Sequence, residues 1–597
     1  MKNHIRTVVT YLITSSLILS TFAPTANGAN PDAPSNFAVT YTAPSANNVS
    51  FGANLTWRSP NAADTLILGY RISGRQLSFI NPPSAGRITR WNAGDAWTDI
   101  YDSRNAVSVA PSRYTLYQGS EAALPVDAGY GLPDGENFEW RVGAVSEEPI
   151  SQRKPGVSNI CVLRTSGTVE CSGLFNAQTA GGVNVFEGPY LKELGTAFSR
   201  DYRPVDGISP SGRVGLVNKL EMGYQMACVI SRAGKLWCWG DQTSSKRTKI
   251  YRVHPTEGDT LTPKMIELGE NVLDVAIARD TTCALVVSGK IKCWGSNEFG
   301  LLGNDSPVGI RNYVRAPVNV NDQDNWIFSE ITATDGTICG IATSKGGQPV
   351  NRQLVCWGET RPMPFVNKPN VAWVTKPYAF TDNSITGNRA AASSPSGNLG
   401  ILSLSLSSIH GCWVKENVGL QCWSLINDPT SFTSRLVNGP TLIDGAIRSA
   451  TEISSDSSGS CWIKPGQINQ IKCIGDNYTG ISTDNQRALL PVTVELNQFQ
   501  NANSVNPQHV SLFAGMRCFT AAPIGDRSNI GGCWGSNVTK LIVDPNAVNE
   551  PDAIPVRTPA QDPALRAPNF AVLQNVVTPP ADWVGSVSLR NIVEGQV

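Results

Sequence analysis

Apolar and polar residues alternate along short segments near the N-terminus of the chain. Residues 35–39, 53–57, 69–72 and 138–145 each carry apolar side chains at every second position. A period of two residues places these side chains on one face of a β-strand. The pattern therefore predicts half-buried strands that pack against a second layer.

A different pattern repeats from residue 157 onward. A proline followed by an apolar segment recurs at 262–268, 316–320 and 490–494, and a further apolar segment then leads into a hairpin bounded by two cysteines. The chain contains 54 Gly and 39 Pro, and 41% of its residues are apolar. This composition is typical of short strands joined by turns around a filled core. The expected fold class is all-β.

The 14 cysteines fall into seven neighbouring pairs, with none left over. A zinc site is the weaker interpretation, because the closest pair is ten residues apart and no CxxC or CxxH half-sites occur. We therefore expect seven disulfides. They are Cys161–Cys171, Cys228–Cys238, Cys283–Cys293, Cys339–Cys356, Cys412–Cys422, Cys461–Cys473 and Cys518–Cys533.

The spacing within a pair has a geometric meaning. In four pairs the separation is ten, and a glycine stands six residues after the first cysteine in three of them and seven after it in the Cys412–Cys422 pair. In the Cys283–Cys293 pair, a three-residue loop that ends at Gly289 in the left-handed conformation places the two cysteines directly opposite each other. Opposed Cα atoms lie about 4.5–5.5 Å apart, which a disulfide tolerates. Closing such a ring stabilises the fold by about 2–3 kcal/mol in the chain-entropy model.

The first cysteines recur at intervals of 49 to 73 residues, the range of propeller blades rather than of helical solenoids. Several hairpins end in Cys-Trp-Gly, and residues 283–303 are the most complete copy. These residues resemble the RCC1-type repeat, particularly its exported bacterial variant with two cysteines in the hairpin. The resemblance implies a seven-bladed β-propeller over residues 157–597. The sequence departs from the repeat at Leu301, Ser172 and Ile474.

The C-terminal segment predicts how the ring closes. Residues 567–572 and 587–595 repeat the proline and strand elements, but no cysteine hairpin follows them, whereas the hairpin at 157–172 lacks such a lead-in. We therefore expect the C-terminal strands to pair with the 157–172 hairpin and remove the exposed sheet edges.

The cysteine-free segment at 30–148 resembles a fibronectin type III domain. Trp57 follows the second strand, and Leu132 to Phe138 is similar to the corner that leads into the sixth strand. Phe138 replaces the usual Tyr, so the hydroxyl bond of a tyrosine corner would be absent. The expected architecture is an N-terminal β-sandwich followed by the propeller.

Charge and the N-terminal segment limit the location and partners. The 48 basic and 48 acidic residues cancel, which gives no overall field for nucleic-acid binding. Residues 1–29 combine a basic start, an apolar stretch and small residues, as in a secretory signal peptide. The apolar stretch is too short and too hydroxyl-rich to span a bilayer. We expect a secreted, periplasmic or cell-surface protein that does not span the membrane.

Sequence motifs for catalysis are absent: the chain contains no GxxxxGK[ST], GxSxG or HExxH. His254, His410 and His509 are far apart, and we interpret His410 as structural, although it could face the channel. Asp322 and Asp324 lack the further ligands of a calcium loop. We expect no catalytic, cofactor-binding or metal-binding residues.

The tryptophans that follow the second cysteines, at positions 239, 294, 357, 423 and 534, could stack on sugars. A residue repeated in successive blades more commonly packs one blade against the next. Functional residues are expected where the copies differ, in the irregular stretches 241–260, 304–315, 359–400 and 424–435.

These observations favour a non-enzymatic protein whose propeller loops bind a protein partner. The RCC1 resemblance implies such a role: nuclear members promote nucleotide exchange on a small GTPase and contact chromatin, and an exported bacterial relative inhibits a β-lactamase. One alternative is a carbohydrate-active or other hydrolytic enzyme with carboxylates in the channel, so a glycan ligand remains open. Another is a structural or adhesive surface component.

Overall fold

The structure is a computed structural model, which describes part of the chain. The described residues are 33–42, 52–58, 66–78, 98–102, 113–116, 137–147, 150–156, 159–174, 177–178, 184–185, 198–224, 226–240, 251–255, 260–321, 323–345, 352–360, 362–364, 372–380, 400–408, 410–423, 441–447, 449, 451–475, 488–496, 505–523, 530–535, 556–561, 570–577 and 586–590. The predicted signal peptide at 1–29 lies outside these ranges, as does the corner at Leu132.

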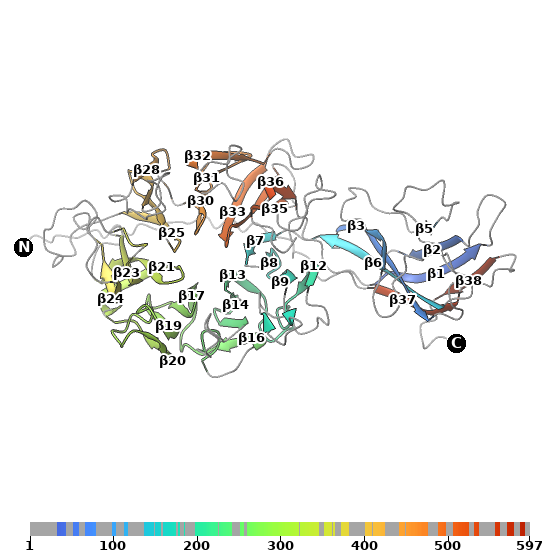
Figure 1. The fold of residues 1–597 in the computed structure, drawn as a ribbon, viewed down its shortest axis with the longest axis horizontal. Coiled ribbons are helices and arrows are strands. Elements are labelled where there is room, and N and C mark those ends of the chain that lie inside the picture. The colour runs from blue at the N-terminus through green and yellow to red at the C-terminus, as the bar shows by residue number, and fades with distance from the viewer. Residues whose placement is uncertain are drawn as a thin grey trace, which may run out of the picture.

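The fold is all-β, as the sequence predicts, and Figure 1 shows a ring of sheets beside a sandwich. Two four-stranded sheets, in the orders β38-β1-β2-β5 and β37-β6-β3-β4, form the sandwich. Their strands are β1 (Ser35–Thr42), β2 (Gly52–Arg58), β3 (Leu66–Ser78), β4 (Thr98–Asp102), β5 (Arg113–Leu116), β6 (Asn137–Glu147), β37 (Phe570–Val577) and β38 (Ser586–Arg590).

The ring contains seven four-stranded antiparallel sheets within the described residues. From the inner to the outer strand they are β7 (Ile150–Pro155), β8 (Asn159–Arg164), β9 (Val169–Leu174) and β12 (Phe198–Pro204); β13 (Val217–Gly223), β14 (Met226–Ser231), β15 (Leu236–Gly240) and β16 (Thr260–Ile266); β17 (Val272–Ile277), β18 (Thr281–Val286), β19 (Ile291–Asn297) and β20 (Gly309–Asn319); β21 (Trp326–Ala333), β22 (Thr337–Ser344), β23 (Gln353–Glu359) and β24 (Trp373–Ala379); β25 (Ile401–Leu406), β26 (Gly411–Lys415), β27 (Gly419–Trp423) and β28 (Thr441–Asp444); β29 (Ile453–Asp456), β30 (Gly459–Trp462), β31 (Gln470–Gly475) and β32 (Ala488–Glu495); β33 (Val505–Phe513), β34 (Met516–Pro523), β35 (Ile530–Gly535) and β36 (Val556–Gln561).

Two minor elements complete the described structure. A two-stranded ribbon is formed by β10 (Ala177–Gln178) and β11 (Asn184–Val185), and a 3-10 turn, η2, spans Gln323–Asn325. In the described part of the chain, no helix has the length and apolar character that crossing a membrane would need.

The ring closes by packing between sheets. Each inner strand contacts the inner strand of the next sheet, and β33 contacts β7. At this last interface, Ile150, Val162 and Tyr202 of the first sheet share one apolar cluster with Met516 and Cys533 of the last sheet. No strand of one sheet needs to pair with another sheet to close the ring.

The predicted closure by the C-terminal strands is therefore wrong. β37 pairs with β6, and β38 pairs with β1, so both strands belong to the sandwich (Figure 1). The proline strand that completes the last sheet is β36, which contains Pro559. The inner position before the first hairpin is filled by β7, which begins shortly after β6 ends at Glu147.

The ring is consequently inserted between two neighbouring strands of one sandwich sheet. The chain leaves the sandwich after β6, forms β7 to β36, and returns as β37 beside β6. Trp57 and Tyr70 pack edge-to-face in the sandwich core, with ring centroids 5.1 Å apart. Trp140 and Leu573 are also buried, so residues from both ends of the chain build this core.

The cysteine pairs lie opposite each other in the hairpins, and each pair forms a disulfide with Cα atoms 4.1 Å apart. In the third sheet, Cys283 pairs in register with Cys293, and Gly289 has a φ of 76° in the hairpin loop. The left-handed backbone explains the glycine at this position.

In the five sheets that have it, the Cys-Trp dipeptide at the second cysteine supplies both faces of the sheet. Cys293 packs with Phe328 of the next sheet, whereas the adjacent Trp294 packs with Leu236 of the preceding sheet. Successive residues of a strand point to opposite faces, so each dipeptide contributes to two interfaces. Trp239, Trp357, Trp423 and Trp534 also lie in clusters that join two sheets, which confirms the packing role expected for these tryptophans.

Candidate functional site

Each of the seven sheets has a polar residue at a fixed place in its inner strand or directly before it, and five of these residues line a cavity at the ring axis. This residue stands nine positions before the first cysteine of the sheet. In six of the seven strands a register shift directly precedes it, and such bulges re-aim side chains. We call this set ring A: Gln152, Lys219, Asp274, Glu330, Ser403, Glu452 and His509.

A second level lies two residues further along each inner strand, directly opposite the first cysteine in register. Residues two apart share one face of a strand, and all seven residues of the second level line a cavity at the ring axis, as do five of the first level, without Gln152 and His509. We call this second set ring B: Lys154, Glu221, Ala276, Thr332, Ser405, Ser454 and Ser511.

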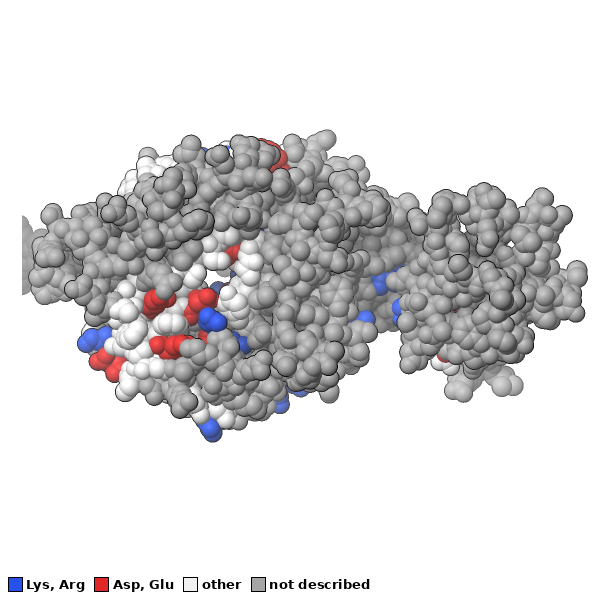
Figure 2. All heavy atoms as spheres, viewed as in Figure 1, with Lys and Arg blue, Asp and Glu red and all other residues white. Residues whose placement is uncertain are grey.

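The inner strands enclose a cavity of about 640 Å³. Its charged lining residues come from rings A and B and are Lys154, Lys219, Glu221, Asp274, Glu330 and Glu452. Figure 2 shows the ring hollowed at its centre, with Asp and Glu side chains beside the hollow. The channel is thus polar and, on the described residues, carries more carboxylates than lysines.

Most polar side chains of the channel link neighbouring sheets. The Lys154 ammonium lies 3.2 Å from Glu221, and Lys219 pairs with Asp274. Asp274 also accepts a hydrogen bond from the Ile331 backbone N–H at 3.2 Å. These contacts join the first four sheets, so the lysines are neutralised within the protein.

The same kind of link recurs in the other sheets. Ser403 accepts a hydrogen bond from the Thr451 N–H at 3.0 Å, and Ser454 accepts one from the Leu512 N–H at 2.9 Å. His509 lies 3.3 Å from Glu452. The polar lining therefore also helps to hold the ring together.

Glu330 differs from the other channel carboxylates because no cation pairs with it among the described residues. Burial, followed by the negative charges of Asp274 and Glu452, raises the pKa of Glu330 to about 7, although Lys219 and a hydrogen bond from the Leu404 backbone act in the opposite direction. Burial also raises the pKa of Glu452, but the hydrogen bond and charge of His509 outweigh it and lower that pKa. Glu330 is therefore the carboxylate that can change charge near neutral pH.

We predict that Glu330 makes the protein less stable as the pH rises from about 4.5 to about 7. A folded-state pKa above the ordinary value means that the folded chain holds the proton more tightly, so stability falls until the folded pKa is passed. The effect is about 3 kcal/mol, since one pKa unit corresponds to about 1.4 kcal/mol. Between pH 5 and pH 8, the melting temperature of the Glu330→Gln variant should fall less than that of the wild type.

The matched control for this measurement is Glu495→Gln, at an exposed carboxylate of the outer strand β32. The melting temperature of this variant should change between the two pH values as much as that of the wild type does. If the melting temperatures of Glu330→Gln and the wild type change equally between pH 5 and pH 8, the predicted destabilisation by Glu330 is incorrect.

One end of the channel carries an aromatic pair. Tyr224 follows β13 and Phe513 ends β33, and their rings meet edge-to-face with centroids 5.1 Å apart. Burial and the nearby Asp335 charge raise the pKa of Tyr224, while Arg279 lowers it. Burial likewise raises the pKa of Asp335, against the charge of Arg279. Two aromatic rings, a carboxylate and a guanidinium thus gather at this entrance.

Strand direction defines the two faces of the ring. The entrance with Tyr224 lies where inner strands turn into the second strands of their sheets, and the third strands end at the same level, as the pairing of Met226 with Gly240 shows. We call this side the turn face. The opposite side, which carries the hairpin loops such as that at Gly289, is the hairpin face.

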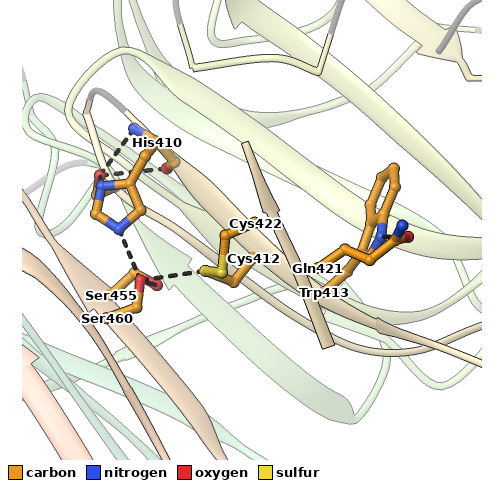
Figure 3. Close-up of a disulfide and its surroundings, with 8 residues drawn as sticks. His410, Cys412, Trp413, Gln421, Cys422, Ser455 and Ser460 are labelled. Atoms are coloured by element: carbon orange, nitrogen blue, oxygen red, sulfur yellow. Dashed lines mark hydrogen bonds between the residues drawn. A yellow bond between two sulfur atoms is a disulfide. The ribbon is translucent and has the colours of Figure 1, made fainter. Parts of the chain in front are cut away.

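His410 does not line the channel. The residue is 3% exposed, and Figure 3 shows its ring pointing toward Ser460. Nδ1 lies 2.8 Å from the Ser407 hydroxyl, and Nε2 lies 2.6 Å from the Ser460 hydroxyl, which in turn lies 2.8 Å from the Ser455 hydroxyl. The Cys412 sulfur lies 3.3 Å from the same Ser460 oxygen. His410 therefore links two sheets, in agreement with its interpretation as a structural residue.

The remaining sequence candidates lie apart from the channel or outside the described residues. His254 Nε2 lies 3.1 Å from the Met265 carbonyl oxygen, and Asp324 forms an exposed ion pair with Lys290. Asp322 is outside the described ranges. No cluster of three metal-ligating side chains occurs in the part of the chain that the structure describes.

The sequence predictions missed rings A and B as a site, except that His509 was noted as an isolated histidine. The signal that could have found ring A is the constant nine-residue spacing before the first cysteine, at which every copy has a polar residue. The alternation of apolar and polar residues does not identify ring A, because the bulge inserts one residue and so interrupts the two-residue period of the inner strand.

Comparison with protein-family models finds no match, and comparison with curated protein sequences also finds none. A structure of Kap60 bound to yeast RCC1 (Prp20) has a TM-score of 0.46 at 16% identity, covering 61% of this chain and 78% of that chain. Prp20p from Saccharomyces cerevisiae, described with its binding to Gsp1p and histones, has a TM-score of 0.45 at 13% identity over 75% and 90%.

Human WBSCR16 has a TM-score of 0.38 at 10% identity, covering 82% of this chain and 94% of that chain. Similarities of this size do not carry function to this protein. The fold described above rests on the observed strand pairing, sheet order and closed ring of contacts.

Proposed function

We propose that the protein is an exported, non-enzymatic binding protein that presents the turn face of its ring to a protein partner. The observation that carries this proposal is the position of the irregular stretches. The segments at 241–260, 304–315 and 424–435 follow the third strand of a sheet, as does the part of 359–400 that precedes β24, whereas the part of 359–400 beyond β24 follows an outer strand that ends at the hairpin face. The third strands of these sheets run antiparallel to the second strands and end at the turn face, so the connection that follows each of them leaves the sheet there.

The described part of one connection is held firmly in place. Asn297 donates to the Pro307 carbonyl at 3.0 Å and accepts from the Leu302 N–H at 3.1 Å. The Leu301 carbonyl accepts from the Trp357 indole at 2.8 Å, which fixes the connection to the next sheet. Preordered loops lose less entropy on binding, which favours a recognition surface.

The charge pairing in the channel supports a role without catalysis. Asp274 is bonded to Lys219 and to a backbone N–H, and Glu452 lies against His509. Glycoside hydrolysis uses two carboxyl groups, and the carboxylates of Asp274 and Glu452 are engaged in these contacts rather than free to act with Glu330. The hydrolytic alternative requires such a pair.

Export is supported by the seven disulfides, which suit an oxidising compartment, and by the signal-like residues 1–29. The sandwich is proposed to be related to fibronectin type III domains, with β1 to β6 before the ring and β37 in the edge position beside β6. The proposed boundaries are 30–148 with 565–597 for the sandwich, and 150–561 for the ring.

We predict that replacing residues 241–250 by a Gly-Ser linker of the same length abolishes partner capture, because this changes a turn-face connection and keeps the buried Arg252 and Val253 that follow it. The bait is the chain from residue 30, incubated with extracts of its own cell envelope and of competing or host cells, followed by mass spectrometry. The matched control replaces residues 346–351, between β22 and β23 on the hairpin face, and should retain the partner.

Two results would count against this function. Loss of capture in the 346–351 variant alone would move the interface to the hairpin face. A response on a glycan array, with no protein retained by the bait, would favour carbohydrate binding instead.

A further inference from the structure

Two tyrosines and an arginine gather at the outer edge of the turn face, where the second and third sheets meet. The Tyr251 and Tyr313 ring centroids are 5.8 Å apart, and the Arg315 guanidinium carbon lies 4.3 Å from the Tyr251 centroid. Tyr313 pairs with Ser296, close to the end of β19 at the turn face. Both tyrosines are half-buried, and Arg315 is exposed. We call Tyr251, Tyr313 and Arg315 the rim cluster.

The segment that carries Tyr251 is held between these two sheets. The Arg252 guanidinium is buried 3.6 Å from the Asp280 carboxylate, and the Arg252 carbonyl accepts from the Thr282 hydroxyl at 2.7 Å. Val253 is fully buried in the apolar cluster that joins the two sheets. Tyr251 itself has a φ of 56°, a left-handed backbone that is strained for a bulky residue. Such strain persists where the surroundings fix the backbone, and it is common at binding sites.

Arg315 keeps a positive charge that the protein does not neutralise. No carboxylate pairs with it among the described residues, whereas the neighbouring Arg252 is paired with Asp280. Stacking on the Tyr251 ring holds the planar guanidinium in place, and the N–H groups at the edge of the guanidinium remain able to donate. A carboxylate accepts two such donors in parallel. The rim cluster therefore fits an acidic side chain of a binding partner.

The sequence on either side of the two tyrosines favours the same kind of partner. Residues 246–252 and 311–315 contain six basic residues and no acidic one, although the whole chain has 48 basic and 48 acidic residues. A local excess of positive charge attracts acidic partners and raises their rate of association. Tyr and Arg are also among the residue types that most often carry the binding energy of protein interfaces.

The stacking geometry is less suited to a sugar. Arg315 covers one face of the Tyr251 ring, and Tyr313 lies against the same ring at an interplanar angle of 31°. The tyrosines thus support the guanidinium, and the guanidinium edge is the group that remains to contact a ligand.

We propose that the rim cluster binds an acidic segment of the protein partner, with Arg315 as the charge partner of a carboxylate and the two tyrosines as its support. This inference rests on the proposed function, since it names the part of the turn face that the partner contacts. Because the contact is exposed, added salt should screen it and weaken binding.

The test is fluorescence anisotropy of the chain from residue 30 at low ionic strength, with a labelled peptide of alternating Glu and Gly as the probe. We expect saturable binding to the wild type that weakens about tenfold in Arg315→Gln, because charge-assisted hydrogen bonds are lost. Arg315→Lys keeps the charge but loses the planar set of donors, so its affinity should lie between these two. Arg232→Gln, at an exposed arginine of a hairpin-face loop, should bind like the wild type.

The proposal is overturned if the Glu-Gly peptide does not bind, or if Arg315→Gln weakens binding no more than Arg232→Gln does. Equal binding of a peptide of alternating Gln and Gly, or of a single-stranded oligonucleotide, would also overturn it. Such results would exclude recognition of carboxylates at this site.

The capture experiment separates this inference from the proposed function. If the 241–250 variant loses a captured protein that Arg315→Gln retains, the turn face binds the partner without the rim cluster, and only the inference fails. If the bait retains no protein while the Glu-Gly peptide binds and depends on Arg315, the proposed function fails and the acidic-ligand site holds.

Discussion

Removal of residues 565–597 should unfold the sandwich and leave the ring folded. The deletion removes β37 and β38, which cover the edges of β6 and β1. It also removes Ala571 and Leu573 from the buried core, and it exposes two strand edges that would pair with other chains. All strands of the seven ring sheets remain.

The measurement is thermal unfolding followed by circular dichroism, together with limited proteolysis. We expect the transition of the ring to persist at an unchanged temperature, while the sandwich becomes sensitive to protease before residue 150. A chain that ends at residue 590 keeps both strands and serves as the control. If the deletion instead abolishes the ring transition, the C-terminal strands close the ring in solution, as the repeat pattern alone had predicted.

Replacement of Trp357 by Ala should destabilise the ring by about 3–5 kcal/mol, the range for removing a large buried aromatic side chain. Trp357 is fully buried and packs edge-to-face on Phe328, with ring centroids 6.4 Å apart. Its indole N–H also donates to the Leu301 carbonyl. The substitution therefore leaves a cavity between two sheets and an unpaired carbonyl oxygen.

Urea denaturation followed by circular dichroism measures this effect. Trp373→Ala is the matched control, because Trp373 is 43% exposed on the outer strand β24 of the same sheet, and it should change the unfolding free energy by less than about 0.5 kcal/mol. Trp357→Phe keeps an aromatic ring and should fall between these two variants. Equal losses for Trp357→Ala and Trp373→Ala would contradict the packing role.

The sequence predicted the parts of the fold that local geometry determines. Two cysteines ten residues apart, with a glycine six after the first, require a tight hairpin, and the Cys283–Cys293 hairpin has that register. The Cys-Trp pattern also predicted that Trp packs sheet against sheet, since every interface of a ring repeats the same contact.

The closure could not be predicted in this way because it depends on distant pairing. Phe570 pairs with Gly143 across more than four hundred residues, and nothing local to either strand records that partner. The segment at 567–572 has the proline and apolar pattern of a ring strand, yet the outer position of the last sheet was already filled by Val556–Gln561. The sequence pattern identified this segment as a strand, but it did not identify the strand with which the segment pairs.

The channel lining was hidden for a different reason. Ring A contains amide, hydroxyl, imidazole, ammonium and carboxylate groups, so no single residue type repeats. Only the seven inner strands, brought around one axis, show that Lys219 and Asp274 meet, and that Glu330 is left without a cation among the described residues. Charge pairing between sheets is a property of the closed ring.

The insertion of the ring into the sandwich also determines how the molecule would respond to mechanical load. A pulling force applied at residues 33 and 590 acts on β1 and β38, whose outer ends lie side by side because Ala38 pairs with Arg590. Such a force would peel this strand pair apart one hydrogen bond at a time, starting from the ends. The disulfide-closed sheets lie outside that path, so the sandwich would yield first and the ring would carry no tension until the sandwich strands had separated.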